Sequence, residues 1–546
     1  MSTRTDVTRR LFTAIALCSI WAVACSRASD SGKQVIASSD SFSPGFFNPP
    51  AGVHPVNALM PARFRGARPS YAWRIHNGKR ELVAFSTPIQ HIVIIEMENR
   101  TPEDLFGAYY NSPAPNGTPL GDLTELDLVA PTATALTPEP LNAKYNPNHE
   151  HEPGFTNKAS NMNWMALKGL VYVPSPAPAS TDPSVVNYLT LIEKFGYGNH
   201  VLQSNEGPSF EAHQYSIAAQ SGGLPGSSLT PYGMVNNPGA MAGNDDEPLV
   251  DDVGDGTCFN TPSSAMDVEM TDMTTPYPGN QTAAPTATPC NEYTTILDEM
   301  ASAAPSTAPY YQWQYVASGK KSIWAAPMSV KHLYQAYNSG VLFQFQPFAV
   351  DPDAFNFVLN VTGSTSPAPS PLRPFAALTY LTPCLFESDH PNSAGIDNGP
   401  QWLAWVVDSI ESSSYWQNTV IIVTWDDWGG FWDNYTPSPW PFHHTPPPSP
   451  YNASNPNEWG FRVPLIVISP WVKQSNYVSS TKRSQGAILA FVEDTFGLSS
   501  LNGDDQSNDD LADMFNFSGV VPLPTASVLT RFSPQPVGAC PGPTQL

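Results

Sequence analysis

The sequence is poor in charged side chains. Asp, Glu, Lys and Arg make up 13% of its 546 residues, about half of the usual share. Basic residues are the scarcest, with 25 against 48 acidic ones, and the formal net charge is −23. Such a surface repels nucleic acid and anionic lipid, so we expect no nucleic-acid partner. It also repels anionic substrates at long range, and an anionic substrate would need a locally positive site such as a metal.

Long apolar runs are missing beyond the N-terminus, so we expect no transmembrane span there. Residues 1–25 differ, because Arg9 and Arg10 precede an apolar run that ends in the cleavage signal Ala22–Ala24. This pattern predicts a signal peptide and export to the periplasm or the medium. The run is shorter than the roughly 20 residues of a span, although an N-terminal anchor is the alternative. Cys25 follows directly, and the sequence leaves open whether it is lipidated.

Cysteines are few, six in all. Four lie beyond the signal region, and an even number in an exported chain indicates disulfides. Cys258–Cys290 is the local pairing, and Cys384–Cys540 would tie down the C-terminus. Four free thiols are the alternative, and none of the cysteines has zinc-site spacing.

Apolar runs rich in β-branched residues predict three buried parallel strands, at 89–95, 419–424 and 463–468. Helical patterns at 401–413 and 487–496 alternate with them, which is typical of an α/β fold with a mostly parallel sheet. Ligands of such sheets bind at the carboxyl ends of the strands. The residues that follow the predicted strands are therefore the candidates for a site.

The chain divides by composition. Residues 26–86 form an N-terminal extension without clear periodicity, and residues 87–500 form the main domain. Within it, 225–290 is rich in Pro, Gly, Asn, Asp and Thr and is predicted to be an insertion loop. Residues 501–546 are a C-terminal segment that we expect to pack on the domain. The acidic pairs in 504–510 are expected on a solvated surface.

Acidic and amide side chains follow two of the predicted strands. Glu98 and Asn99 come after the first, and Asp426 and Asp427 come after the second. Adjacent aspartates behind a buried strand are costly unless a cation compensates them, and carboxylate and amide oxygens suit a divalent metal. Gly429-Gly430 would let the backbone turn sharply beside the site. Capping of loops by the acidic pairs is the alternative, and the residues alone leave both open.

A serine at a helix start is the third candidate. Ser209 follows Gly207-Pro208 and stands at the predicted N-cap of a helix that runs to about Gln220. Helix capping explains such a serine by itself. A helix N-terminus also stabilises negative charge, and a serine that touches a metal there is activated as a nucleophile.

Together these segments resemble the bacterial phosphoesterase family that contains phospholipases C and an acid phosphatase. The matching blocks follow the family's order over residues 88–498. They are Glu98–Arg100, Gly207–Ser209, Ser388–Pro391, Thr419–Asp433, Gly460–Pro464 with Ile468–Trp471, and Phe491–Asp494.

The resemblance implies an alkaline-phosphatase-like fold, a three-layer α/β sandwich with a mostly parallel central sheet and long Pro-rich insertion loops. It also implies a divalent metal of unknown identity, a phosphate-ester substrate and a phosphoserine intermediate. The implied metal ligands are Glu98, Asn99, Asp426, Asp427 and Ser209, with Ser209 as the nucleophile. His149 and His390 would hold phosphate or pass protons. His213, one turn past the nucleophile, is expected to serve in helix packing.

Three histidines of the family pattern are missing, and Asn434, Ser480 and Gln485 stand in their places. His443 and His444 are expected in an exposed loop, and substitution for one of the missing histidines is the alternative. The predicted function is an exported phosphoesterase of the phospholipase C or the acid phosphatase type. A metal-binding protein of the same fold without turnover is the alternative. Head group, monoester or diester preference and oligomeric state stay open.

Overall fold

The structure is a computed structural model, and it describes about two fifths of the chain. The predicted signal peptide, Cys25 and His149 lie outside the described part, as do most of 225–290 and the chain beyond 517. The described residues are 69–76, 79–106, 185–204, 209–221, 258, 269–270, 282–283, 292–302, 313–318, 322, 324–340, 345–348, 375–383, 385–391, 399–413, 415–431, 433, 459–501 and 503–517.

Helices and strands alternate along the described chain. The α-helices are α2 (Pro102–Phe106), α4 (Val186–Lys194), α5 (Ser209–Ala218), α6 (Ile296–Ser302), α7 (Lys331–Asn338), α9 (Gly399–Glu411) and α10 (Gly486–Phe496). The 3-10 helices are η7 (Ala326–Ser329), η8 (Leu385–Glu387), η9 (Trp416–Asn418), η10 (Asp504–Ser507) and η11 (Ala512–Met514). The strands are β1 (Pro69–His76), β2 (Lys79–Ser86), β3 (His91–Met97), β4 (Gly196–Gly198), β5 (Val201–Leu202), β6 (Glu269–Met270), β7 (Thr282–Ala283), β8 (Trp313–Ser318), β9 (Phe345–Phe348), β10 (Leu378–Leu381), β11 (Thr419–Trp425), β12 (Leu465–Ile468), β13 (Tyr477–Ser479) and β14 (Arg483–Ser484).

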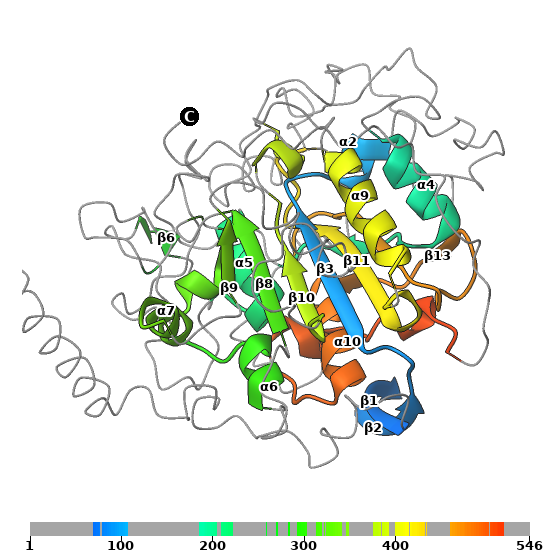
Figure 1. Ribbon diagram of the computed structural model, residues 1–546, viewed down its shortest axis with the longest axis horizontal. Helices are drawn as coiled ribbons and strands as arrows, with labels where there is room; N and C mark the ends of the chain where they lie inside the picture. The colour runs from blue at the N-terminus through cyan, green and yellow to red at the C-terminus, as the bar shows by residue number, and fades with distance from the viewer. Residues whose placement is uncertain are drawn as a thin grey trace, which may run out of the picture. The chain divides into compact units, whose positions relative to one another are not determined.

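An eight-stranded sheet in the order β13-β4-β12-β11-β3-β10-β8-β9 forms the core (Figure 1). Strand β12 is antiparallel to its neighbours β11 and β4, and every other neighbouring pair in this sheet is parallel. The predicted α/β class with a mostly parallel sheet is confirmed. The prediction that the run at 463–468 is a parallel strand is wrong, because β12 enters the sheet in the opposite direction.

Helices cover both faces of the sheet. Helices α4 and α9 contact each other on one face, and α5, α6 and α10 contact one another on the other (Figure 1). Strands β3 and β11 are therefore buried on both sides, which explains their continuous β-branched runs. The helices predicted at 401–413 and 487–496 correspond to α9 and α10. Among the described residues, no helix is long and apolar enough to cross a membrane.

The C-terminal acidic pairs are largely buried, which corrects the expectation of a solvated surface. Asp504 and Asp505 have no exposed surface. Asp504 Oδ1 accepts a hydrogen bond from Trp459 Nε1 at 2.8 Å, and Asp505 Oδ1 accepts one from the Gly503 N–H at 2.7 Å. Burial raises the pKa of Asp504. These donors make the burial of the carboxylates tolerable, and distance along the sequence hides the one from Trp459.

One cysteine of the predicted disulfides is described. Cys258 is disulfide-bonded, and its backbone N–H donates to the Met328 carbonyl at 3.0 Å. The other cysteines of the two predicted pairs lie outside the described residues, so both pairings stay predictions. Strands β6 and β7 pair within the segment that the sequence marks as an insertion loop.

A histidine between two carboxylates joins α7 to α6. His332 Nε2 lies 2.9 Å from Asp298 Oδ1, and Nδ1 lies 2.7 Å from Glu292 Oε1. Burial lowers the pKa of His332, but the two carboxylates outweigh burial and raise the pKa to about 10. The imidazole is therefore charged at neutral pH and bridges the two segments.

We expect His332→Gln to destabilise the protein in a pH-dependent way. The folded pKa of His332 lies above its unfolded value of 6.5, so the stabilisation is complete below pH 6.5 and is lost as the pH rises towards 10. Urea unfolding of both proteins across that window should show a difference in unfolding free energy that shrinks with pH. A difference that does not change with pH would contradict the charge interaction.

Candidate functional site

The register of two strands sets the first four candidate residues side by side. Strands β3 and β11 pair in parallel with Met97 opposite Trp425, so Glu98 and Asp426 leave the sheet at the same edge. The Asn99 N–H donates to Asp426 Oδ1 at 2.8 Å. Glu98, Asn99, Asp426 and Asp427 are at most 1% exposed. The structure thus brings together residues that are far apart in the sequence.

A left-handed turn allows the two strand ends to approach. Asn99 has φ 58°, and Gly429 and Gly430 have φ 62° and 72°. A Cβ atom at Gly429 would lie 2.2 Å from the Asn99 carbonyl oxygen, so a side chain has no room there. The Gly429 N–H donates to Asp427 Oδ1 at 2.6 Å. The predicted sharp turn is confirmed, and it fixes the direction of Asp427.

Ser209 is the first residue of α5 and is fully buried. Its Oγ lies 3.1 Å from Asn99 Oδ1 and 3.1 Å from Asp427 Oδ2, as donor in both contacts. One hydroxyl proton serves one acceptor at a time. The N–H groups of the first helical turn point to the same end of α5 and favour negative charge there. Ser209 therefore stands between the two loops that carry the candidate ligands.

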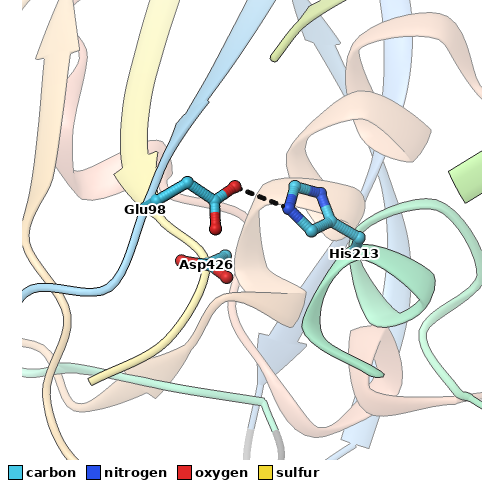
Figure 2. A group of neighbouring side chains, drawn as sticks. All are labelled: Glu98, His213 and Asp426. Carbon is cyan, nitrogen blue, oxygen red and sulfur yellow. Dashed lines mark hydrogen bonds and ion pairs between the residues drawn. The ribbon is translucent and has the colours of Figure 1, made fainter. Parts of the chain in front are cut away.

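His213 is also part of this cluster, which the sequence argument missed. Its Nε2 lies 2.8 Å from Glu98 Oε1, and its Nδ1 lies 3.2 Å from Glu96 Oε2. Figure 2 shows the imidazole pointing at Glu98, with Asp426 beside them. The expected packing role does not account for two contacts with carboxylates. The spacing in the sequence could have identified His213. Residues four apart on a helix share a face, and Ser209, four residues before it, was already a candidate.

The cluster has the composition of a metal site. Ligand atoms of Glu98, His213 and Asp426 all lie within 4.8 Å of one another, and the three residues are buried. Several carboxylates gathered in a dry interior are unfavourable unless a cation compensates them. Carboxylate, amide and imidazole groups are all metal ligands. The residues therefore fit a divalent metal.

Two of the three positions that lack a family histidine are described. Gln485 supports the site from behind, because its Nε2 donates to the carbonyls of Trp425 at 2.7 Å and Asp426 at 3.1 Å. Ser480 is exposed, and its carbonyl lies 3.1 Å from His200 Nδ1. Asn434 lies outside the described residues. The Gln485 side chain thus binds backbone carbonyls, and it offers a substrate no titratable group.

Ring contacts through Trp324 connect His390 with His213. The His390 ring is 5.8 Å from the ring of Trp324, which is 6.4 Å from the ring of His213. The Glu98 N–H donates to the Ser388 carbonyl at 2.7 Å, so the segment that carries His390 is fixed to β3. His149 cannot be placed, since it lies outside the described residues.

Asp389 anchors this segment. It has φ 75°, and its Oδ2 accepts hydrogen bonds from Tyr188 Oη at 2.6 Å and Trp425 Nε1 at 3.2 Å. The Arg100 guanidinium donates twice to the Asp389 carbonyl. Burial raises the pKa of Asp389 to about 7, although Tyr188 and Arg100 act in the opposite direction. The segment before His390 is thus held by a carboxyl group that is half protonated near neutral pH.

We expect Asp389→Asn to stabilise the protein above pH 7. The folded pKa of about 7 exceeds the unfolded value of 3.8, so the wild type loses stability as the pH rises through this window. Asn accepts the same two hydrogen bonds, tolerates a positive φ and does not titrate. In thermal or urea unfolding, the unfolding free energy of the mutant relative to that of the wild type should increase between pH 3.8 and 7. Parallel pH profiles would rule out a buried titration at this position.

Comparison with known proteins gives a family match over most of the chain. The model of the Phosphoesterase family matches residues 89–499. Non-specific phospholipase C6 of Arabidopsis thaliana is 30% identical over 142 residues, which are 23% of this chain and 27% of that protein. Non-hemolytic phospholipase C of Pseudomonas aeruginosa is 28% identical over 130 residues, 20% of this chain and 18% of that protein. The chain therefore aligns to less than a third of these relatives' own length.

A solved structure also aligns with the chain. It is described as a protein in the alkaline phosphatase superfamily from Vibrio parahaemolyticus. The alignment covers 84% of this chain and 79% of that one, at 10% identity and a TM-score of 0.33.

Proposed function

The chain belongs to the Phosphoesterase family, and on that premise we propose that it is an exported, metal-dependent hydrolase of phosphate esters with Ser209 as its nucleophile. The observation that carries the proposal is the position of the Ser209 hydroxyl. It lies 3.1 Å from both Asn99 Oδ1 and Asp427 Oδ2, at a helix N-terminus and beside buried carboxylates. Family membership and the phospholipase C relatives support the hydrolysis of phosphoric esters.

The proposed metal ligands are Glu98, Asn99, Asp426, Asp427 and Ser209. A bound divalent metal would stabilise the serine alkoxide and offset charge on the phosphoryl oxygens. A hydrogen bond to Asn99 or to Asp427 orients the Ser209 hydroxyl before the substrate binds. The N-terminus of α5 adds favourable dipoles where negative charge develops.

In the proposed reaction, Ser209 Oγ attacks phosphorus, and the bond between phosphorus and the alcohol oxygen breaks. The alcohol leaves with a proton, and water then hydrolyses the phosphoserine to restore Ser209. His390 and His149 are the proposed groups that hold phosphate or pass protons. Gln485 cannot donate a titratable proton, because it is a carboxamide whose Nε2 binds two backbone carbonyls.

The named activity of the relatives favours a phospholipid diester as substrate, of the phospholipase C type. A small phosphomonoester, of the acid phosphatase type, is the second substrate class. The alternative function is a metal-binding protein of the same fold without turnover, and the glutamine at position 485 is the observation that favours it. Export rests on the predicted signal peptide, with Cys25 as the site of lipidation if the chain is anchored.

We expect Ser209→Ala to lower kcat for a chromogenic phosphate ester by several orders of magnitude, because the nucleophile is removed. Chelator should also abolish wild-type turnover, and added divalent metal should restore it. Ser216→Ala is the matched control, since Ser216 lies on the same helix and donates to the His213 carbonyl at 2.9 Å. It should keep most of the activity.

The same assay separates the substrate classes. The rate of hydrolysis is compared for a chromogenic monoester, the matching diester and phosphatidylcholine vesicles. The preferred ester assigns the enzyme to the phosphatase or the phospholipase C type. Acid quenching during turnover should trap phosphate on the peptide that contains Ser209. Turnover that survives in Ser209→Ala would overturn the nucleophile, and metal binding without any turnover would favour the binding protein.

A further inference from the structure

His213 lies between two carboxylates that leave the same strand. Glu96 and Glu98 are two residues apart near the end of β3, so their side chains point to the same face of the sheet. His213 approaches that face from α5, with Nδ1 at 3.2 Å from Glu96 Oε2 and Nε2 at 2.8 Å from Glu98 Oε1. None of the three side chains is more than 2% exposed.

The number of protons on the His213 ring limits how it can interact with two carboxylates. A neutral imidazole carries one N–H, so it donates to one carboxylate and presents a lone pair to the other. A lone pair and a carboxylate oxygen that face each other at 2.8 Å repel, so either a second ring proton or a metal ion lies between Nε2 and Glu98. With a metal bound, Glu96 accepts the N–H from Nδ1, and Nε2 and Glu98 bind the metal together.

The geometry suits a small cation. Transition-metal bonds to nitrogen and oxygen are about 2.0–2.2 Å long, so two ligands at a right angle lie about 3 Å apart. The 2.8 Å between Nε2 and Glu98 Oε1 is close to this value. Asp426 has a carboxylate oxygen within 4.8 Å of a ligand atom of His213 and of Glu98, and it completes a three-sided site (Figure 2).

His332 provides a contrast. It also lies between two carboxylates, yet its side chain is 18% exposed, and the group of metal-ligating side chains found among the described residues does not include it. Its contacts join two segments of backbone. His213 instead shares its carboxylate Glu98 with the proposed metal site.

We propose that His213 Nε2 is a ligand of the metal and that Glu96 is its positioning residue, so that the site selects a divalent transition metal such as Zn²⁺ or Co²⁺ over Ca²⁺ and Mg²⁺. This inference rests on the proposed function. Imidazole suits transition metals, whereas Ca²⁺ and Mg²⁺ prefer oxygen ligands alone. A carboxylate on the far ring nitrogen fixes the tautomer and the orientation of a ligating histidine.

The test is metal binding by the full-length protein after chelator treatment, with Zn²⁺, Co²⁺, Mg²⁺ and Ca²⁺ titrated separately by calorimetry. The wild type should prefer the transition metals. Glu96→Gln should weaken their binding by about 10- to 100-fold, as expected for an outer-shell carboxylate. His213→Gln should weaken it further and leave Mg²⁺ and Ca²⁺ binding nearly unchanged, so that selectivity falls.

The Co²⁺ absorption spectrum gives a second readout, which a purely structural role would not change. His213→Gln should shift the visible bands because a nitrogen ligand is replaced, and Glu96→Gln should leave their positions unchanged. His332→Gln is the matched control and should alter neither affinity nor spectrum. If His213→Gln fails to fold, the Glu96→Gln titration still decides the question.

Two results would overturn the inference, and they differ from failure of the proposed function. In the first, both variants keep the transition-metal affinity and the Co²⁺ spectrum of the wild type, and the wild type shows Ser209-dependent turnover. This result would exclude His213 and Glu96 from the metal site and would leave the proposed function standing. Absence of any metal binding by the wild type would overturn the proposed function as well.

Discussion

The gathering of carboxylates in a dry interior is the constraint on which the rest of the site depends. Four carboxylates lie at the ends of β3 and β11, and each residue is at most 1% exposed: Glu96, Glu98, Asp426 and Asp427. Ionised groups are buried at a cost of several kcal/mol each unless opposite charge or hydrogen bonds compensate them. The neighbouring structure is arranged accordingly. The Asn99 and Gly429 N–H groups donate to Asp426 and Asp427. Ser209 contacts Asp427 Oδ2, and His213 contacts Glu98 Oε1.

Much of this arrangement could be predicted from local sequence. The runs before Glu98 and Asp426 are continuous and β-branched because both faces of the sheet are covered, and the parallel pairing then places their ends together. Gly429 was expected at a sharp turn, and its φ of 62° meets that expectation. These features depend on backbone geometry within a few residues, which is what sequence patterns record.

Other features depend on contacts between distant segments, and sequence patterns do not record those. A run such as 465–468 is equally apolar in either direction, so its antiparallel pairing with β11 was missed. Asp504 looks like a surface residue until Trp459, which is distant in the sequence, donates to its carboxylate. His213 looks like a helix-packing residue until the register of β3 brings Glu96 and Glu98 to it.

The glutamine at position 485 shows how support from the C-terminal segment reaches the site. Gln485 accepts a hydrogen bond from the Ser204 N–H at 3.1 Å and holds the carbonyls that precede Asp427. The adjacent Ser484 N–H donates to Asn508 Oδ1 at 2.6 Å. The buried acidic segment therefore fixes Gln485, and Gln485 fixes the loop of Asp426. A histidine here would offer one N–H donor when neutral, whereas the carboxamide offers two donors and an acceptor. Gln485 therefore supports the loop but cannot transfer a proton, so this role in the proposed reaction falls to other groups. His390, next to the buried Asp389, is one that the structure describes.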